Sequence, residues 1–330
     1  MIDFRYHLVS IVAIFLALSV GIVLGTTLLE DPVIKASELA VNQFREGNNE
    51  LRDQVEALQK REAANDAFVT ADTPRLVRDA LTGERIVIVE APGSTASVRE
   101  AAQQVIEEAG ATVSGRITLT ERYVDPAQAG FIDKLAVGAK APETVFSVED
   151  TAYDKAAEVL AGAVLTSDSS QVGEEHPAGA GVLDAFQRAG LLTVTGEPAR
   201  RAEAALVIAP AEAYTGETAG EQAGALVTLA TGLDDAGQGT VLAGTQTSVA
   251  TGGVLAALRE DAALTEKVSS VDTADMPAGR VVVVYALREQ LTGLAGQYGI
   301  GPGVTGLEPS ATPTPTPTAA PTAATATSGG

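Results

Sequence analysis

An uncharged segment from Leu8 to Leu29 constrains this chain more than any other feature of its sequence. As a helix of about 22 residues it would span roughly 33 Å at 1.5 Å per residue, which matches a bilayer core of about 30 Å. The apolar region of a cleaved signal peptide is shorter, at about 7–15 residues. The length therefore predicts a retained membrane anchor, and a cleaved signal peptide or a buried core helix are the alternatives. The predicted anchor includes Leu8, Phe15, Gly21, Gly25 and Leu29.

The charges on either side of this anchor predict its orientation. Arg5 and the α-amino group precede it, against the single acid Asp3, whereas Glu30 and Asp31 follow it directly. Positive charge stays on the cytoplasmic side of a membrane. We therefore expect a single-pass protein of the cell membrane, with a cytoplasmic N-terminus and the bulk of the chain extracytoplasmic.

The chain is strongly acidic, with a formal net charge of −21, and it contains no cysteine. Such acidity argues against nucleic acid as a partner and against charge-driven binding to anionic lipid. The lack of cysteine excludes a disulfide framework, a thiolate metal site and a thiol nucleophile. The composition therefore fits an exported protein that does not depend on oxidative folding.

A heptad pattern follows the anchor, with positions a at 34, 41, 48, 55 and 62 and positions d at 37, 44, 51, 58 and 65. Asn48 at an a position favours a parallel two-stranded coil, because two buried amides can satisfy each other. The G-x-x-x-G spacing of Gly21 and Gly25 also favours helix pairing. We expect a homodimer through a helix over 31–65, and an amphipathic helix that packs on its own globular domain is the alternative. The predicted seam consists of Val41, Phe44, Asn48, Leu51, Val55 and Leu58.

Beyond Thr73-Pro74 the sequence alternates between apolar strands and helices of about 10–15 residues. Nearly continuous apolar runs such as "RIVIVE", "ALVIAP" and "VVVVYAL" indicate strands buried on both faces, and the last is expected to lead into a helix. Further helices are expected over 94–110, with a cap at its start, and over 248–261. The pattern predicts an α/β sandwich domain with a mostly parallel sheet.

The C-terminal residues "GLEPSATPTPTPTAAPTAATATSGG" have no apolar periodicity, and their Thr-Pro repeats favour polyproline II. Such a segment cannot bury enough surface to fold, so a disordered tail is expected. The sequence therefore predicts four parts, which are a transmembrane anchor over 1–30, a coiled-coil helix over 31–72, an extracytoplasmic α/β domain over 73–305 and the tail over 306–330.

Side chains with catalytic or metal-binding chemistry are sparse. Glu174, Glu175 and His176 are candidate metal ligands, but three adjacent residues cannot easily surround one ion, and a solvated acidic loop is the alternative. The junctions "EAPGSTAS" and "AGTQTSVATGG" match neither G-x-G-x-x-G nor a P-loop, and ordinary turns explain both. No Ser-His-Asp arrangement is evident. We therefore expect no enzymatic activity and no cofactor.

Four blocks of the sequence resemble one known family in the same order. They are "HLVSIVAIFLALSVGIVLG", "NNELRDQVEAL", "VRDALTGERIVIVEAPG" and the run from "GTVLAGTQTS" to "GLAGQYGIGPG". From Ile2 to Gly303 the chain is similar to the actinobacterial copper transport protein B family, also called the mycobacterial copper transporter family. The resemblance implies an envelope protein associated with low cellular copper, described as an outer-membrane, pore-forming efflux component. Copper is implied by this resemblance alone.

A second hypothesis from the sequence is structural. A dimeric anchor, a stiff coil and an acidic α/β head would suit a scaffold that regulates cell-wall remodelling or cell separation. Such a scaffold would act through a protein partner in the envelope or the cytoplasm. Because only residues 1–7 precede the anchor, a cytoplasmic partner would bind within the membrane or to that short tail.

Overall fold

The computed structural model describes residues 4–310 of the 330-residue chain, without the side chains of 27–40. Residues 311–330, which hold most of the predicted disordered tail, lie outside the described residues. The chain divides into two units, Met1–Asn65 and Asp66–Gly330, and each is described by itself. The four-part division expected from the sequence stays a prediction.

Helix α1 (Phe4–Leu76) is continuous. It extends past Asn65, where the sequence pattern predicted its end, and through Pro74. A proline removes one backbone donor and disturbs the preceding turn, so its effect is local when it lies close to the end of a helix. Thr73 Oγ1 donates to the carbonyl oxygen of Val69 at 2.8 Å within that last part of the helix. The helix therefore ends about three turns beyond Asn65 and about one turn beyond residue 72, the end of the predicted coiled-coil part.

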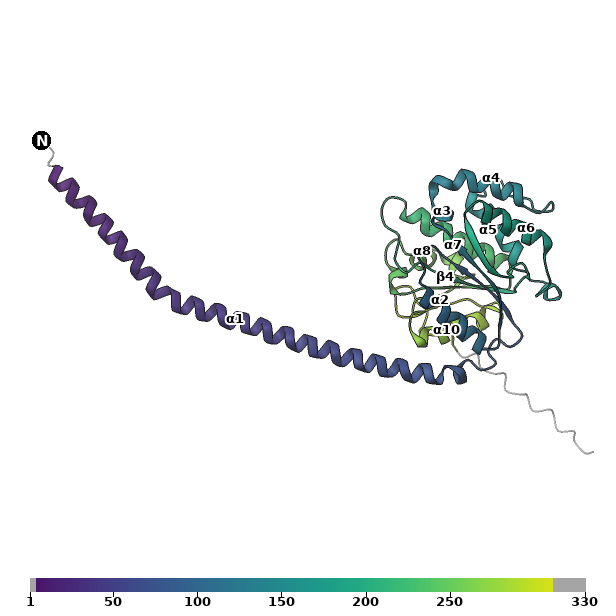
Figure 1. Cartoon of the computed structure of the whole chain (residues 1–330), viewed down its shortest axis with the longest axis horizontal. Coiled ribbons are helices and arrows are strands. Elements are labelled where there is room, and N and C mark those ends of the chain that lie inside the picture. Colours follow the sequence, from purple (N-terminus) through teal and green to yellow (C-terminus); the bar gives the residue numbers. More distant parts are fainter. Residues whose placement is uncertain (1–3, 311–330) are drawn as a thin grey trace, which may run out of the picture. The chain divides into compact units, whose positions relative to one another are not determined.

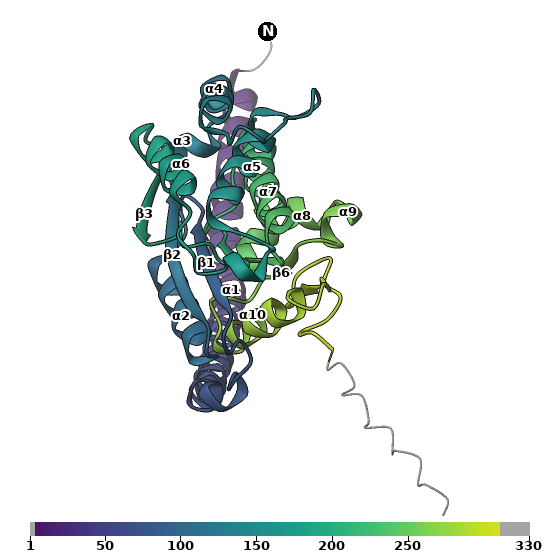
Figure 2. The same cartoon turned by 90° about the vertical axis from the view of Figure 1, so that its right-hand side faces the viewer.

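The second unit contains a seven-stranded sheet. Its strands are β1 (Arg85–Glu90), β2 (Thr112–Leu119), β3 (Leu192–Gly196), β4 (Ala204–Ile208), β5 (Gly239–Ala243), β6 (Ser269–Val271) and β7 (Gln297–Tyr298). The strand order is β3-β2-β1-β4-β5-β6-β7, and Figure 2 shows β3, β2 and β1 next to one another. All neighbouring strands are parallel except β2 and β3, so the predicted mostly parallel sheet is confirmed.

Helices cover both faces of this sheet (Figure 1). One face packs against α2 (Ala96–Glu108) and α10 (Pro277–Gln290), and the other against α5 (Ala152–Val164), α6 (Pro177–Arg188) and α7 (Ala219–Ala236). Helix α4 (Ala129–Ala139) packs against α5 and α6. Ile86 and Ile88 of β1 belong to the first core, whereas Val87 and Val89 belong to the second. Because both sets of alternating side chains are buried, the strand is a continuous apolar run in the sequence. The short helices are α3 (Glu121–Val124), α8 (Val254–Arg259), α9 (Ala262–Thr265), η1 (Pro126–Gln128), η2 (Ser169–Gln171) and η3 (Gln246–Val249).

Residues 281–284, predicted as a strand, lie instead in helix α10. Pro277 is the first residue of this helix, where proline is well tolerated. All four valines are buried, because α10 packs against α2, β5 and β6. Four consecutive buried valines show no amphipathic period, so their apolar run resembles that of a buried strand.

Two predicted helices differ from the structure in their details. The helix expected over 248–261 is divided, because Gly252 has φ of +83° between the end of η3 and the start of α8. Helix α2 is terminated near Gly110 as expected, where φ is +93°. A side-chain cap was expected at the start of α2, and this prediction is wrong. Thr95 occupies the N-cap position, but its side chain makes no capping hydrogen bond. The sequence pattern also missed α4, β6 and β7.

Candidate functional sites

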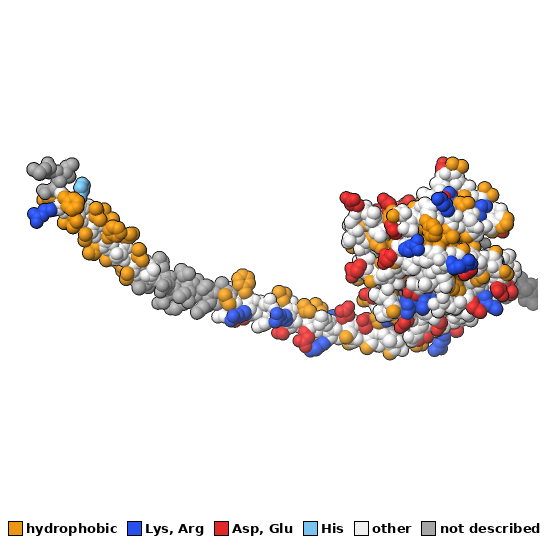
Figure 3. Space-filling model, turned by 45° about the horizontal axis from the view of Figure 1, so that its top comes forward, with side chains coloured by type: hydrophobic (Ala, Val, Ile, Leu, Met, Phe, Trp, Pro, Cys, Tyr) orange, Lys and Arg blue, Asp and Glu red, His pale blue; other side chains and the backbone are white. Residues whose placement is uncertain are grey.

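The first part of α1, Phe4–Thr26, is long and apolar enough to cross a membrane. It has 23 residues, a mean hydropathy of 2.8 and no buried part. Figure 3 shows its hydrophobic side chains at the surface. Ser19 and Thr26 donate their hydroxyls to the carbonyl oxygens of Phe15 and Ile22, so these polar groups are satisfied within the helix. The predicted apolar helix is therefore confirmed.

The predicted anchor positions differ in what surrounds them. Leu8 and Phe15 are more than half exposed. At Gly21 and Gly25 no atom lies within 4 Å of the place that a Cβ would occupy. This open surface of small residues would allow a second helix to approach closely. The side chain of Leu29 lies outside the described residues.

The apolar side chains of the predicted seam are 45 to 79 % exposed. Two shallow hollows lie along this side of α1. The first is lined by Val41, Phe44, Arg45, Asn48, Asn49 and Arg52, and the second by Asn48, Leu51, Arg52, Val55, Glu56 and Gln59. The second set is the first shifted by seven residues along the helix, which matches the heptad spacing of a surface that accepts knobs from a partner helix. The two-stranded coil itself stays a prediction.

The candidate metal ligands lie just before α6. Glu174 and Glu175 are exposed, and His176 is partly buried at the N-cap position of α6. Burial, together with the nearby positive charge of Arg201, lowers the pKa of His176. Among the side chains that the structure describes, no group of three or more His, Cys, Asp or Glu residues is arranged to hold a metal ion. The exposure of the two glutamates fits the alternative, a solvated acidic loop.

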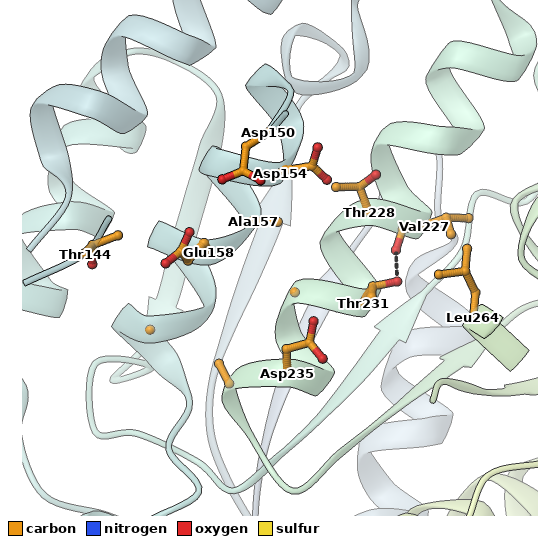
Figure 4. Close-up of a pocket in the computed structure, with 13 residues that line it drawn as sticks. Thr144, Asp150, Asp154, Ala157, Glu158, Val227, Thr228, Thr231, Asp235 and Leu264 are labelled. Carbon is orange, nitrogen blue, oxygen red and sulfur yellow. Dashed lines mark hydrogen bonds between the residues drawn. The ribbon is translucent and has the colours of Figure 1, made fainter. Parts of the chain in front are cut away.

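A hollow of about 650 Å³ lies between α5 and α7, and we name it the acidic hollow (Figure 4). The helices pack closely at its floor, where a Cβ on Gly232 would lie 2.8 Å from the Cβ of Ala157. The acidic residues that line it are Asp150, Asp154, Glu158 and Asp235. Sequence reasoning missed this site. The spacing of the first three acids by four residues is a signal that was present, but the fourth comes from another helix.

The carboxylates of the acidic hollow are only partly neutralised by neighbours. Asp235 pairs with Lys267 at 2.6 Å, and Asp154 accepts from the backbone and hydroxyl of Thr151 in a capping box. Burial, and then the negative charge of Asp150, raise the pKa of Glu158. The positive charge of Lys140 acts on the pKa of Glu158 in the opposite direction. With four carboxylates against Lys140 and Lys267, the hollow keeps an excess of negative charge that would attract a cation or a basic side chain.

From β1 the sheet is extended on one side by β2 and β3 and on the other by β4 to β7, so its topological switch point lies between β1 and β4. Open α/β sheets commonly bind ligands at the carboxyl ends of the strands at such a point. In this chain, backbone hydrogen bonds link the residues that follow β1 to the end of β4 and the residues that follow it. Ala91 N donates to Ile208 O at 2.9 Å, and Ala211 N donates to Gly93 O at 3.0 Å. These two backbone donors are therefore used within the chain.

Glu90, the last residue of β1, is buried at the same edge of the sheet. Its carboxylate pairs with Arg116 at 2.8 Å and with Arg99 at 3.3 Å. A buried carboxylate needs such partners, because leaving its charge unpaired away from water is costly. Glu90 thus has two guanidinium partners, whereas the buried Nε of Arg99 has no hydrogen-bond partner among the described residues.

Comparison with known proteins gives consistent matches. The family model described as "Copper transport outer membrane protein, MctB" matches residues 1–309. Proteins named "Copper transporter MctB" from Mycobacterium tuberculosis (strain ATCC 25618 / H37Rv) and Mycobacterium bovis are 29% identical over 310 residues, covering 92% of this chain and 98% of each relative. The protein of the same name from Mycobacterium leprae (strain TN) is 29% identical over 337 residues, covering 93% and 99%. These relatives are named as transporters, not as enzymes.

Proposed function

Because the chain belongs to the family described as copper transport outer membrane protein MctB, we propose that it acts in copper transport at the cell envelope. The observation that carries this proposal is the extent of the match, which covers residues 1–309 and so includes both the apolar helix and the α/β unit. Copper is here the transported substrate. The role proposed is in efflux, which keeps cellular copper low.

The residue composition limits the kinds of copper site that the chain could provide in such transport. Copper(I) prefers soft sulfur ligands, and this chain has no cysteine and two methionines, Met1 and Met276. Carboxylates and imidazole are the remaining ligands, and the acidic hollow carries four carboxylates. We propose that the chain contributes position and electrostatic attraction at the membrane, and not a thiolate-type copper site.

Deletion and complementation test this function. Removing the gene should raise cellular copper, measured by mass spectrometry of the metal, and should lower growth in copper-containing medium. The intact chain should restore both. A version in which residues 1–30 are replaced by a cleavable export signal should restore neither, because the head would no longer be held at the membrane. Unchanged copper content in the deletion strain would contradict the proposal.

We propose further that the first part of α1, Phe4–Thr26, is a single-pass anchor of the cell membrane with a cytoplasmic N-terminus. Arg5 before the apolar segment and Glu30 and Asp31 after it support this orientation. The family description names the outer membrane, so separation of the two membranes by density is the direct test. Recovery of the chain with cell-membrane markers is expected, and recovery with outer-membrane markers would contradict it.

A second candidate function is a dimeric scaffold that regulates cell-wall remodelling or cell separation through a protein partner. The exposed apolar seam and its two hollows, spaced by seven residues, favour it. Leu51→Asp should break the dimer, whereas Ala57→Asp, at a c position on the same helix, should not. If Leu51→Asp alone impairs cell separation and leaves copper tolerance intact, the scaffold is the function that needs the dimer. If Leu51→Asp instead lowers copper tolerance and leaves cell separation intact, copper transport is the function that needs the dimer.

A further inference from the structure

An apolar hollow of about 240 Å³ lies where the end of α1 meets α10 and the residues that follow β7. It is smaller than the roughly 300–1,000 Å³ of typical small-molecule sites, so it suits one large side chain better than a ligand. Two residues that line it, Ile300 and Leu307, are themselves exposed. Its lining includes Val69, Leu76, Met276, Val282, Tyr285 and Leu307.

The end of α1 is fixed beside this hollow by its own unit. Tyr285 Oη donates to the carbonyl oxygen of Leu76 at 3.0 Å. Thr73 is buried and Asp66 is partly buried, so the side of α1 that carries them faces the rest of the unit. Phe68 lies on a different side of the same turns and is 72 % exposed. A large aromatic side chain left in water is a candidate contact residue.

The heptad numbering of the seam can be continued along the sequence to these residues. Val69 and Leu76 then occupy a positions, Asp66 and Thr73 occupy e positions, and Phe68 occupies a g position. In a parallel two-stranded coil, the g residue of one helix lies beside the e residue of the other. Phe68 of a second copy would therefore lie beside the e position of Thr73 and above Val69, and Val69 lines the apolar hollow.

The charge of Asp72 does not oppose this contact. Asp72, at a d position, would face its own counterpart across the seam. Its carboxylate is bound by Arg75 of the same chain, with nitrogen–oxygen distances of 2.7 and 2.6 Å. The positive charge of Arg75 therefore compensates Asp72 before the two copies meet.

We propose that the apolar hollow receives Phe68 of a second copy of this chain, so that the two α/β units are joined where the coil ends. By the two-fold symmetry of a dimer the contact forms twice. Each Phe68 fills the hollow between α1 and α10 of the other copy. This inference rests on the dimer proposed above and adds to it a contact outside the predicted seam.

Crosslinking of the full chain tests the contact, and the absence of native cysteine makes single-cysteine versions unambiguous. One tagged copy carries Phe68→Cys, and a second, differently tagged copy carries Leu307→Cys at the edge of the hollow. Oxidation in detergent should give a disulfide between the two tags. Replacing the second copy by one with Val145→Cys, which is 86 % exposed elsewhere, should give none. Asn48→Cys in both copies reports the seam separately.

Each possible crosslinking result either supports or overturns the proposed contact. Crosslinks at both 48 and 68–307 support the seam and the hollow together. A crosslink at 48 without one at 68–307 overturns the hollow contact and leaves the dimer standing. A crosslink at 68–307 without one at 48 supports the hollow and contradicts the seam. The absence of both overturns the dimer and with it this inference.

A binding measurement gives the energetic test. Phe68→Ala should raise the dimer dissociation constant of the full chain by about 30-fold, as expected for an aromatic side chain at the centre of a contact. Phe131→Ala, the matched change at an exposed phenylalanine of α4, should leave that constant unchanged. Sedimentation in detergent measures both. Equal constants for the two variants would overturn the proposal.

Discussion

Arg259 and Asp272 form a buried ion pair whose removal has a predictable cost. Asp272 is fully buried, and the side chain of Arg259 is 4 % exposed. Arg259 Nη1 lies 2.8 Å from Asp272 Oδ2. The same carboxylate accepts from Gln246 Nε2 at 2.8 Å and from the backbone nitrogens of Ile300 and Gly301 at 2.9 and 3.0 Å. Asp272 therefore holds the segment after β7 against β6.

Substituting Arg259→Met would leave Asp272 buried without its counter-charge. Breaking one partner of a buried pair costs about 3–5 kcal/mol, because the remaining charge is uncompensated. The bonds from Arg259 to the carbonyl oxygens of Tyr298 and Pro302 would be lost as well. In a folded unit of about this size, 1 kcal/mol lowers Tm by roughly 2–4 °C. The expected drop is therefore about 6–20 °C.

Scanning calorimetry of the full chain in detergent measures this drop. Arg188→Met is the matched control, because its partner Asp184 is exposed and an exposed pair contributes at most about 1 kcal/mol. Adding Asp272→Asn to Arg259→Met should restore part of the lost stability, since the amide keeps an acceptor without the charge. If Arg259→Met and Arg188→Met lower Tm equally, the reasoning on the buried charge is refuted.

Three further outcomes are expected. The mature chain should keep its N-terminus, and a reporter fused at Gly330 should be active only outside the cell membrane; a mature chain that begins near Thr26 would contradict the anchor. Leu51→Asp should abolish dimers in sedimentation by placing an unpaired charge in each strand, at several kcal/mol per dimer, and no change in mass would show that the seam is not an interface. Burial, and then the hydrogen bond with Glu84, raise the pKa of Glu203 to about 7 from the ordinary value of 4.5. The folded state thus prefers the protonated acid, and its contribution to stability is present below about pH 4.5 and lost as the pH rises towards 7. Glu203→Gln should therefore raise Tm at pH 8 and not at pH 4, and an equal change at both values would contradict this.

The sequence alone predicted features that depend on a residue's own neighbours along the chain. The apolar helix of α1 is one, because its length and composition are compared with the thickness of a bilayer and no other part of the chain is needed. The buried strands β1 and β4 are another, since short β-branched runs bounded by turns favour strands.

The candidate sites, unlike these locally determined elements, were set mainly by the tertiary structure. Residues 281–284 pack as a helix against α2, β5 and β6, and their apolar run alone did not distinguish a helix from a strand. Pro277, which begins this helix, was a local signal that the strand prediction did not use. The acidic hollow joins Asp235 of α7 to three acids that precede or lie on α5. The apolar hollow joins the end of α1 to α10, which are some 200 residues apart (Tyr285 and Leu76 differ by 209 positions).

The physical reason for this difference is the range of the interactions. A membrane helix satisfies its own backbone hydrogen bonds, so its residues determine it locally. The partner of a buried carboxylate such as Asp272, or the side chains that line a hollow, are set by which elements the sheet brings together. Strand order decides that, and strand order is determined by the packing of both cores at once.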